Sequence, residues 1–328
     1  MHNRGLPKGA MKTILFGATG YLGSHVAEQL ALAGHEVVCV VRPNSNALFL
    51  KTLAVVIEHA DFSDHASFGS YIESGSTVLN CIAETRMHVS DDERRKVECT
   101  LTSALFSAAQ NAGAKRFIQL STVMAYGFDR PEYAIDETYP VSPKYSYSRI
   151  ACEREKILVD QCPATQTELL ILRPSNTFGK RDSSALPVLL ASHEKGIFAA
   201  VGGGDWQFSC MDARDVGRAM VHLLDVAVSK PEIFLVKGYD TSWLEVKAGL
   251  DTVLKRETKL MNLPKPLAMF LGWVMEVIYP YGKQPPLTRF NIEVLATHTL
   301  FNDDKIRSTG FRSQHDLMAT LQNALELS

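Results

Sequence analysis

The feature that most constrains the fold of this 328-residue chain is a glycine-spaced segment at residues 11–23. Residues 11–16 form a short apolar run, which predicts a buried strand. Gly17, Gly20 and Gly23 follow at three-residue spacing, and apolar residues at helical spacing come next. A strand, a glycine turn and a helix in this order predict a site for the pyrophosphate of a dinucleotide, because the helix N-terminus offers free N–H groups and a positive dipole end.

Each glycine of this segment has a separate physical task. Gly17 allows the tight turn, Gly20 lets the backbone approach the pyrophosphate, and Gly23 lets the helix pack closely on the strand. The alternative is a glycine-rich turn that binds nothing. The predicted cofactor contacts of the turn are Gly17, Thr19, Gly20, Tyr21, Leu22 and Gly23.

Composition limits the class of protein. With 46% hydrophobic and 21% charged residues the chain is typical of a soluble globular protein, and its net charge of −2 gives no basic field for nucleic acid. The six cysteines are scattered without a C-x-x-C pair, which indicates buried thiols in a reducing cytoplasm and no metal site. Residues 1–10 are polar and lack the apolar run of a signal peptide, so we expect a disordered extension there.

Strand and helix patterns alternate through the first half of the chain. The predicted strands lie at residues 12–16, 36–41, 54–58, 77–82, 116–120 and 168–172, and the predicted helices at 21–33, 46–53, 91–111 and 144–160. Repeated units of this kind predict an α/β fold with a Rossmann, doubly wound parallel sheet. We expect a nucleotide-binding domain over residues 11–173.

Residues 174–328 follow a looser pattern and predict a smaller, mostly helical part that binds substrate. Helices are expected at 187–195 and from 212 to 224, and the strand at 233–236 is expected to return to the sheet. The stretch 264–281 is rich in apolar residues, but its uncharged run, 266–275, is too short to cross a bilayer. It predicts a buried or substrate-covering helix, with peripheral membrane contact as the alternative.

The residue after the second strand bears on the choice of cofactor. A site for NAD places an acidic residue about 20 residues beyond the glycine motif, to bind the ribose 2′-hydroxyl. This chain has Arg42 there, which can pair with a 2′-phosphate, so we expect NADP(H) to be preferred and NAD(H) to be the alternative. Asp61 and Phe62, after the third strand, are expected at the adenine, and Ala83 is small where the chain passes the cofactor.

Hydroxyl groups suited to acid–base chemistry come next. Ser121 and Thr122 follow the strand at 116–120, at the end of the sheet that faces the ligand crevice. Tyr145 and Arg149 are four residues apart on a predicted helix and therefore share a face. A fixed positive charge favours the phenolate of a nearby tyrosine, which otherwise titrates near pH 10.

These features together resemble the extended branch of the short-chain dehydrogenase/reductase superfamily, of the NAD-dependent epimerase/dehydratase type, over residues 11 to about 315. The resemblance implies that Thr122 polarises the substrate oxygen and Tyr145 is the general acid/base. It also implies that Arg149 holds the nicotinamide ribose, and that Pro174 and Ser175 line the nicotinamide. Such proteins are commonly homodimers, through a bundle that would include helices 91–111 and 144–160.

The chain departs from the family pattern at Arg149 and Glu98, and the nearby Tyr147 lacks a basic partner. Arg149 stands where the family has lysine, and it keeps the charge but does not readily release a proton. Tyr147 has no basic residue four positions later, because residue 151 is alanine. Glu98 stands where the family's long helix usually carries asparagine.

The C-terminal part is similar to the 3β-hydroxysteroid dehydrogenase-like group, in segments 263–268, 285–289, 300–305 and 310–311. That group acts on sterols and other bulky apolar alcohols or ketones, and an apolar helix at 266–278 suits such a substrate. We therefore expect an NADP-dependent oxidoreductase that moves hydride between the nicotinamide and a secondary alcohol or ketone.

Two alternatives stay open. The first is a nucleotide-sugar epimerase, whose diphosphate would need basic residues such as Arg181, Arg214 and Arg218. The second is a non-catalytic NADP(H)-binding sensor, which the replacement of lysine by Arg149 would explain.

Overall fold

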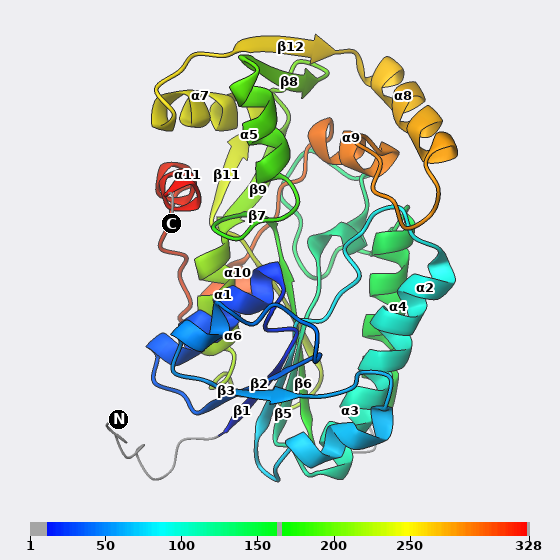
Figure 1. The fold of residues 1–328 in the computed structure, drawn as a ribbon, viewed down its shortest axis with the longest axis vertical. Coiled ribbons are helices and arrows are strands. Elements are labelled where there is room, and N and C mark those ends of the chain that lie inside the picture. The colour runs from blue at the N-terminus through cyan, green and yellow to red at the C-terminus, as the bar shows by residue number, and fades with distance from the viewer. Residues whose placement is uncertain (1–11, 163–165, 327–328) are drawn as a thin grey trace.

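A computed structural model describes residues 12–162 and 166–326, so the extension expected at 1–10 lies outside the described residues. Seven parallel strands form one sheet in the order β10-β6-β5-β4-β1-β2-β3, in the lower half of Figure 1. The strands are β1 (Thr13–Phe16), β2 (Val37–Val41), β3 (Val56–His59), β4 (Thr77–Asn80), β5 (Arg116–Leu120), β6 (Glu168–Pro174) and β10 (Glu232–Val236). The predicted α/β class with a Rossmann sheet is confirmed.

Helices cover both faces of this sheet, which is why its central strands β1, β4 and β5 are buried along their whole length. Leu15 of β1 packs into the core beneath α1 (Tyr21–Leu32) and α6 (Ala213–His222). Ile14 and Phe16, its neighbours in sequence, point to the opposite core beneath α3 (Thr102–Asn111) and α4 (Ser146–Gln161). Alternate side chains thus enter two separate cores, as the pleat of a strand requires.

The strand order reverses at β1. The chain moves from β1 to β2 and β3 on one side, then crosses to β4 and β5 on the other. The crevice outside the carboxyl ends of β1 and β4 is the topological switch point, where open α/β sheets bind their ligands.

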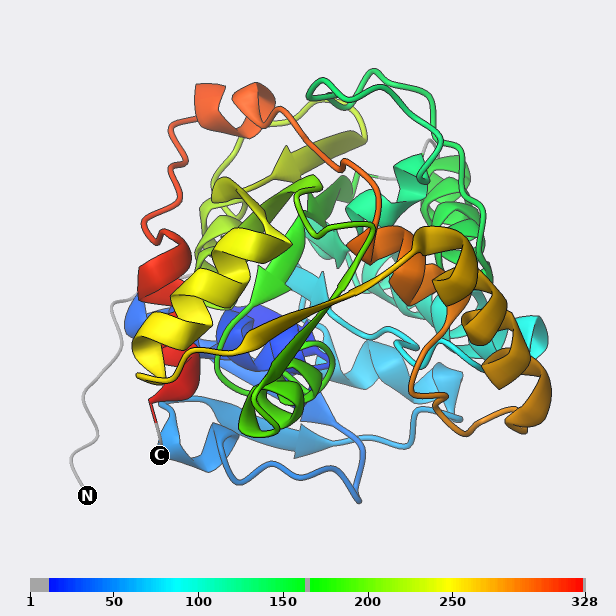
Figure 2. The ribbon, with the colours of Figure 1, turned by 90° about the horizontal axis from the view of Figure 1, so that it is seen from above.

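A second part covers this end of the sheet (Figure 2). It has a sheet of β7 (Asn176–Phe178), β9 (Gln207–Asp212) and β11 (Tyr239–Ser242), and a parallel pair of β8 (Ile197–Val201) and β12 (Lys259–Leu263). Its helices are α5 (Leu186–Glu194), α7 (Trp243–Val253), α8 (Lys265–Ile278), α9 (Arg289–Leu295), α10 (Asp304–Ser308) and α11 (Leu317–Leu325). Among the described residues no helix combines the length and the apolar character needed to cross a membrane.

Two predicted helices differ in the structure. The helix expected at 46–53 is a single 3-10 turn, Leu50–Thr52, because the Asn46 side chain accepts the N–H of Leu48 and forms a local turn instead. The helix expected at 91–111 consists of α2 (Asp91–Arg95), a π-helical turn (Lys96–Leu101) and α3. Glu98 lies in that π turn and is buried.

Candidate active site

The glycine turn after β1 is held by close backbone contacts. Gly17 has a φ of +82°, and a Cβ there would lie 2.6 Å from the carbonyl carbon of Cys81. A Cβ on Gly23 would lie 2.1 Å from the carbonyl oxygen of Gly17. Side chains at these two positions would force β1, β4 and α1 apart, so the glycines set the width of the crevice.

The N-terminus of α1 is open toward this crevice. Gly20 is the N-cap, no side chain caps the helix, and the first turn has no acidic residue. Ser24 N–H is bonded to the Gly20 carbonyl at 2.9 Å, which leaves the preceding N–H groups of the first turn for an anion. Tyr21 contributes only its backbone, because its side chain turns toward His25 and Thr177.

A cavity of about 490 Å³ lies at the ends of β2 and β3. The structure brings together there the three residues expected at the adenosine end, Arg42, Asp61 and Phe62. The side chain of Asp61 accepts the N–H and hydroxyl of Ser63 at 2.9 and 2.7 Å, which lowers the pKa of this carboxyl. Arg42 is exposed, and no ion pair joins it to a carboxylate of the described residues.

The opposite end of the crevice carries the residues expected at the nicotinamide. Pro174 ends β6, and Ser175 is buried, with its N–H bonded to the Val236 carbonyl at 2.9 Å. Its hydroxyl is buried without a partner among the described residues. Ala83 follows β4 and is exposed. These features suit a dinucleotide that lies across the switch point. The open N-terminus of α1 suits the pyrophosphate, the cavity at β2 and β3 suits the adenosine end, and the unsatisfied hydroxyl near β6 suits the nicotinamide end.

Thr122 follows β5 and caps the short turn that comes next. Its Oγ1 accepts the N–H of Met124 at 3.1 Å, so its own hydrogen is free to be donated. That hydroxyl interacts with the phenol of Tyr147, and the interaction counteracts the rise that burial causes in the Tyr147 pKa. The structure therefore joins Thr122 to Tyr147, whereas the sequence motif pairs it with Tyr145.

Tyr145 lies at the N-cap of α4, in extended backbone. Its ring contacts Phe128 and Phe290, with centroids 6.0 and 5.7 Å away, and Lys144 Nζ lies 5.5 Å from the ring centroid. Burial raises the pKa of Tyr145, and Glu293 of α9 raises it further. This phenol therefore faces the second part of the molecule.

The rotation of α4 about its own axis explains why Tyr147, and not Tyr145, lies beside Thr122. Tyr147, Ala151 and Glu155 are four residues apart, and the buried residues of α4 include Ala151 and Glu155. Arg149 instead donates to Asp91 at 2.8 Å, with 46% of its side chain exposed. The expectation that Arg149 supplies the charge beside the catalytic phenol is not met by this geometry, because the guanidinium is engaged at the surface.

Two buried ion pairs fix that rotation. Glu155 bonds to Arg173 of β6, and both side chains are 5% exposed. Arg154 bonds to Glu98 of the π turn, and both side chains are 3% exposed. An unpaired charge in the interior costs several kcal/mol, so other rotations of α4 are strongly disfavoured.

Arg94 of α2 brings positive charge to Tyr147 from another helix. Its guanidinium carbon lies 5.6 Å from the Tyr147 ring centroid, and the residue is fully buried. It donates to the carbonyls of Glu84 and Arg86, which hold it in place. Sequence spacing does not reveal Arg94, because its contact joins residues that are far apart in the chain. It does not single out Tyr147 either, because residue 151 is alanine.

The basic residues considered for a sugar diphosphate are all engaged. Arg214 pairs with Asp212 at 2.7 Å and Arg218 with Asp215 at 2.6 Å. Arg181 pairs with Glu28 at 2.7 Å.

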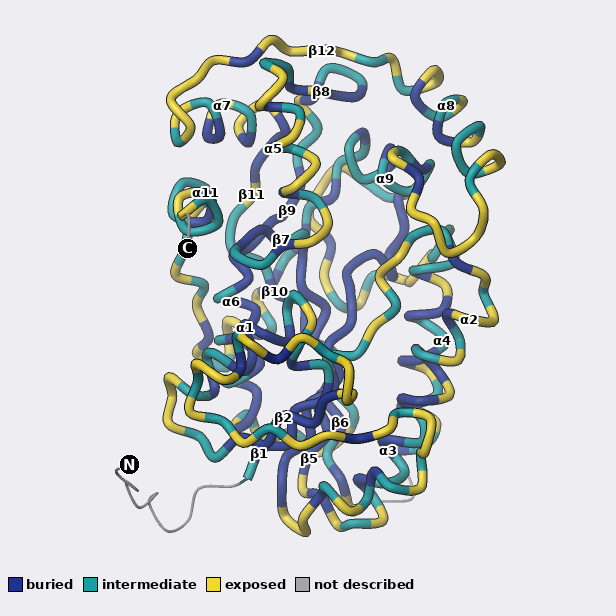
Figure 3. Tube along the Cα trace, viewed as in Figure 1, coloured by how far each residue is buried: buried dark blue, intermediate teal, exposed yellow. Residues whose placement is uncertain are grey.

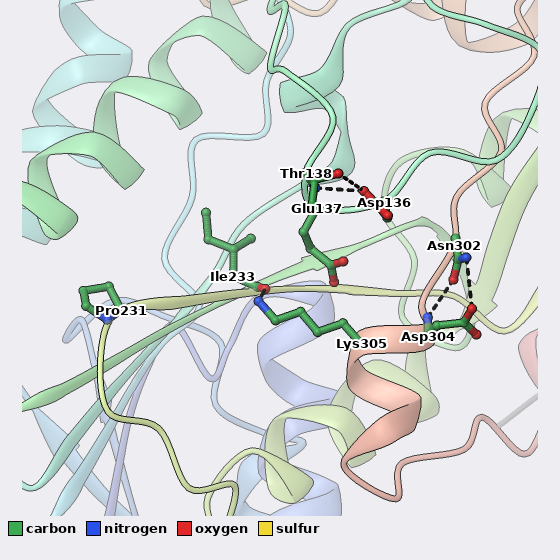
Figure 4. A pocket seen from close by; sticks show the side chains of 8 residues that line it. All are labelled: Asp136, Glu137, Thr138, Pro231, Ile233, Asn302, Asp304 and Lys305. Atoms are coloured by element: carbon green, nitrogen blue, oxygen red, sulfur yellow. Dashed lines mark hydrogen bonds between the residues drawn. The ribbon is translucent and has the colours of Figure 1, made fainter.

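A second cavity, of about 580 Å³, lies apart from the glycine turn (Figure 4). Its polar groups are largely satisfied within the protein. Lys305 donates to Glu232 and to the Ile233 carbonyl, and Asp136 accepts from Thr138. We assign it no part in the reaction.

The Rossmann sheet, the open α1 terminus and the Thr–Tyr pair define a nucleotide-dependent enzyme of the short-chain dehydrogenase type. Residues 13–236 match the model of the NAD dependent epimerase/dehydratase family, and the chain belongs to that family.

Two curated relatives span nearly the whole chain. One is the N-acetyl-α-D-glucosaminyl-diphospho-ditrans,octacis-undecaprenol 4-epimerase of Escherichia coli O157:H7, 24% identical over 95% of this chain and 94% of its own length. The other is the 4-hydroxy-2-methyl-3-oxo-4-farnesyl-3,4-dihydroquinoline-1-oxide ketoreductase of Stigmatella aurantiaca, 23% identical over 90% of each chain. The UDP-glucose 4-epimerase of Thermotoga maritima, solved with UDP-glucose, shares the fold at a TM-score of 0.77 and 16% identity, over 96% of this chain and 98% of its own.

Proposed function

We propose that this protein is an NADP-dependent reductase of a bulky, apolar ketone. The observation that carries the proposal is the Arg94 guanidinium 5.6 Å from the Tyr147 ring, with the Thr122 hydroxyl interacting with the same phenol. The glycine turn, Arg42, Asp61, Phe62, Ala83, Pro174 and Ser175 would hold the cofactor. When bound, the reduced nicotinamide supplies a hydride.

The protein residues manage the substrate oxygen and its proton. The Thr122 hydroxyl, whose oxygen already accepts the N–H of Met124, donates a hydrogen bond to the ketone oxygen and polarises it. Tyr147 Oη gives its proton to that oxygen as the carbonyl carbon receives the hydride, and the product is a secondary alcohol. Arg94 stabilises the phenolate that remains, and a proton from solvent restores the phenol.

The apolar character of the proposed substrate rests on the side chains around the two tyrosines. Phe290 of α9 contacts both Tyr145 and Tyr147, with ring centroids 5.7 Å away in each case. Phe128 closes the same cluster at 5.7 Å from Phe290. A ketoreductase of a farnesylated substrate among the relatives supports this choice, and so does the engagement of Arg181, Arg214 and Arg218 by carboxylates.

The direction of the reaction can be tested by its dependence on pH. Burial raises the Tyr147 pKa above the usual value of a tyrosine, so the phenol is protonated at neutral pH and serves as an acid. Ketone reduction should therefore be flat from about pH 6 to 9 and decline only above about pH 10, whereas alcohol oxidation should rise with pH. Initial rates of NADPH consumption with a panel of apolar ketones measure the reduction, and initial rates of NADPH formation from NADP+ and the product alcohols measure the oxidation. A reduction rate that falls through pH 7 would contradict the assignment.

Arg42 is expected to set the cofactor preference. In Arg42→Ala the affinity for NADPH should fall about 10- to 100-fold, because one charge-assisted contact to a phosphate is lost, while the affinity for NADH should stay the same. Nicotinamide fluorescence in titrations with each cofactor measures this difference. Arg256→Ala, a change of an arginine in the second part, is the matched control. Tighter binding of NADH by the wild-type protein would overturn the NADP assignment.

The same assays separate the other two functions. A nucleotide-sugar epimerase would be stabilised against heat by UDP- or GDP-sugars and would convert them without net consumption of NADPH. A sensor would bind NADPH tightly and turn over no substrate.

A further inference from the structure

The outward side of α8 is an apolar surface. Leu267, Phe270, Trp273, Val277 and Ile278 are 48%, 57%, 48%, 65% and 68% exposed. At 100° per residue these positions fall on one side of the helix, and the outer side of α8 in Figure 3 is coloured as exposed. Phe270 and Trp273 contact each other with ring centroids 6.1 Å apart.

The charged residues of α8 lie on the opposite, inward side. Lys265 donates to the Ala296 carbonyl at 2.8 Å, and Glu276 accepts the N–H and Nε of Arg289 at 2.8 and 2.7 Å. Gly272 is buried so closely that a Cβ there would lie 2.7 Å from the Cδ1 of Ile292. Because Ala268 and Met269 also pack inward, α8 is apolar on both sides and lacks the polar outer side of a helix that faces water.

Exposed apolar residues and exposed lysines also flank α8 along the chain. Leu260 and Met261 of β12 are 43% and 51% exposed, and Tyr281 is 72% exposed. Lys259 and Lys283 are exposed beside them, and no ion pair joins either to a carboxylate in the described part of the chain. Apolar and aromatic residues flanked by unpaired lysines are the pattern of a surface that binds an anionic membrane.

We propose that this surface, which we call the α8 surface (Leu260, Met261, Leu267, Phe270, Trp273, Val277, Ile278 and Tyr281), docks onto a lipid bilayer that contains anionic lipids. A bilayer satisfies both features of the surface, because its acyl region accepts side chains without hydrogen-bonding groups and its headgroups pair with Lys259 and Lys283. A second copy of the chain would cover the apolar side chains but would leave these lysines without anions.

The position of α8 gives docking a consequence for the active site. The inward side of α8 packs on α9 through Gly272 and Ile292, and Phe290 of α9 contacts Tyr147. A ketone dissolved in the bilayer would therefore meet α8 and α9 on its way to Tyr147. This route to Tyr147 rests on the proposed function, whereas docking itself rests on the α8 surface alone.

Vesicle flotation with the full chain tests docking. The probes are vesicles of phosphatidylcholine alone and vesicles of phosphatidylcholine with phosphatidylglycerol, in the absence of cofactor and ketone. The wild-type protein should float with the anionic vesicles, and the triple variant F270S/W273S/V277S should bind at least about tenfold more weakly. The matched control L32S/V188S changes two residues that are 74% and 60% exposed elsewhere, and it should bind like the wild type.

Tryptophan emission locates the contact. The chain has three tryptophans, of which Trp243 is buried and Trp206 donates to the Val201 carbonyl, so a blue shift on anionic vesicles should come from Trp273 and disappear in Trp273→Phe. The proposal would be overturned if the wild-type protein did not float, or if the triple variant floated as well as the wild type. It would also be overturned if the wild type formed a dimer in solution and the triple substitution dissociated that dimer. Because the assay contains no substrate, a protein that reduces ketones but does not float refutes docking alone, and one that floats without turnover refutes the proposed function alone.

Discussion

Tyr147→Phe should reduce ketone turnover by about 10²- to 10⁴-fold, the usual contribution of a positioned general acid. The phenol is the proton donor in the proposed reaction, and it interacts with Thr122, the group that polarises the ketone. The phenylalanine ring still packs against Phe290, so NADPH affinity and the midpoint of unfolding should change little. Steady-state NADPH consumption gives the rate, and fluorescence titration gives the affinity.

Tyr145→Phe separates the structural assignment from the one that the motif suggests. Its ring contacts with Phe128 and Phe290 survive the change, so we expect turnover within about tenfold of the wild type. Tyr133→Phe, at a residue 68% exposed, controls for the loss of a phenol as such. If Tyr145→Phe abolished turnover and Tyr147→Phe did not, the motif-based assignment would stand and ours would fall.

Glu155→Ala should lower the free energy of unfolding by about 3–5 kcal/mol, since it leaves the Arg173 guanidinium buried without its carboxylate. Both side chains of this pair are 5% exposed, and Glu155 also accepts the hydroxyl of Ser121. Urea unfolding followed by far-ultraviolet circular dichroism measures the change. The same experiment tests the rotation of α4, on which the assignment of Tyr147 depends.

Glu153→Ala is the matched control, because Glu153 lies two residues away on the same helix. Glu153 pairs with Arg95 at 2.8 Å, and these side chains are 43% and 42% exposed. A pair in that position contributes less than about 1 kcal/mol. A larger loss from Glu153→Ala than from Glu155→Ala would mean that α4 is rotated differently, and Tyr147 would then lose its place beside Thr122.

The nucleotide-binding half could be predicted from sequence because its signals are local. A strand, three spaced glycines and a helix define the turn at residues 13–32 without knowledge of any other segment. Arg42 and Asp61 follow the consecutive strands β2 and β3. Parallel strands have their carboxyl ends at one edge of the sheet, so the two residues lie at the same cavity. The class of fold follows from the same repetition, whereas the order of the strands comes from the structure.

The arrangement at the tyrosines could not be predicted in this way, because contacts between distant segments decide it. The spacing of Tyr145 and Arg149 fits one helix face, but the ion pairs of Arg154 with Glu98 and Glu155 with Arg173 turn a different face inward. The π turn that brings Glu98 inward has no distinct sequence pattern. The strands of the second part, such as β7 and β11, have only three or four residues, too few for a clear period.

The place of β10 at the edge of the large sheet has a consequence for how the protein is made. Residues 232–236 pair with β6, and α6 supplies part of the layer that covers α1. On the ribosome, a nascent chain that ends near residue 173 would expose the free edge of β6 and the bare apolar side of α1, both of which favour aggregation. The nucleotide-binding half can therefore complete its folding only after the chain has been synthesised through residue 236.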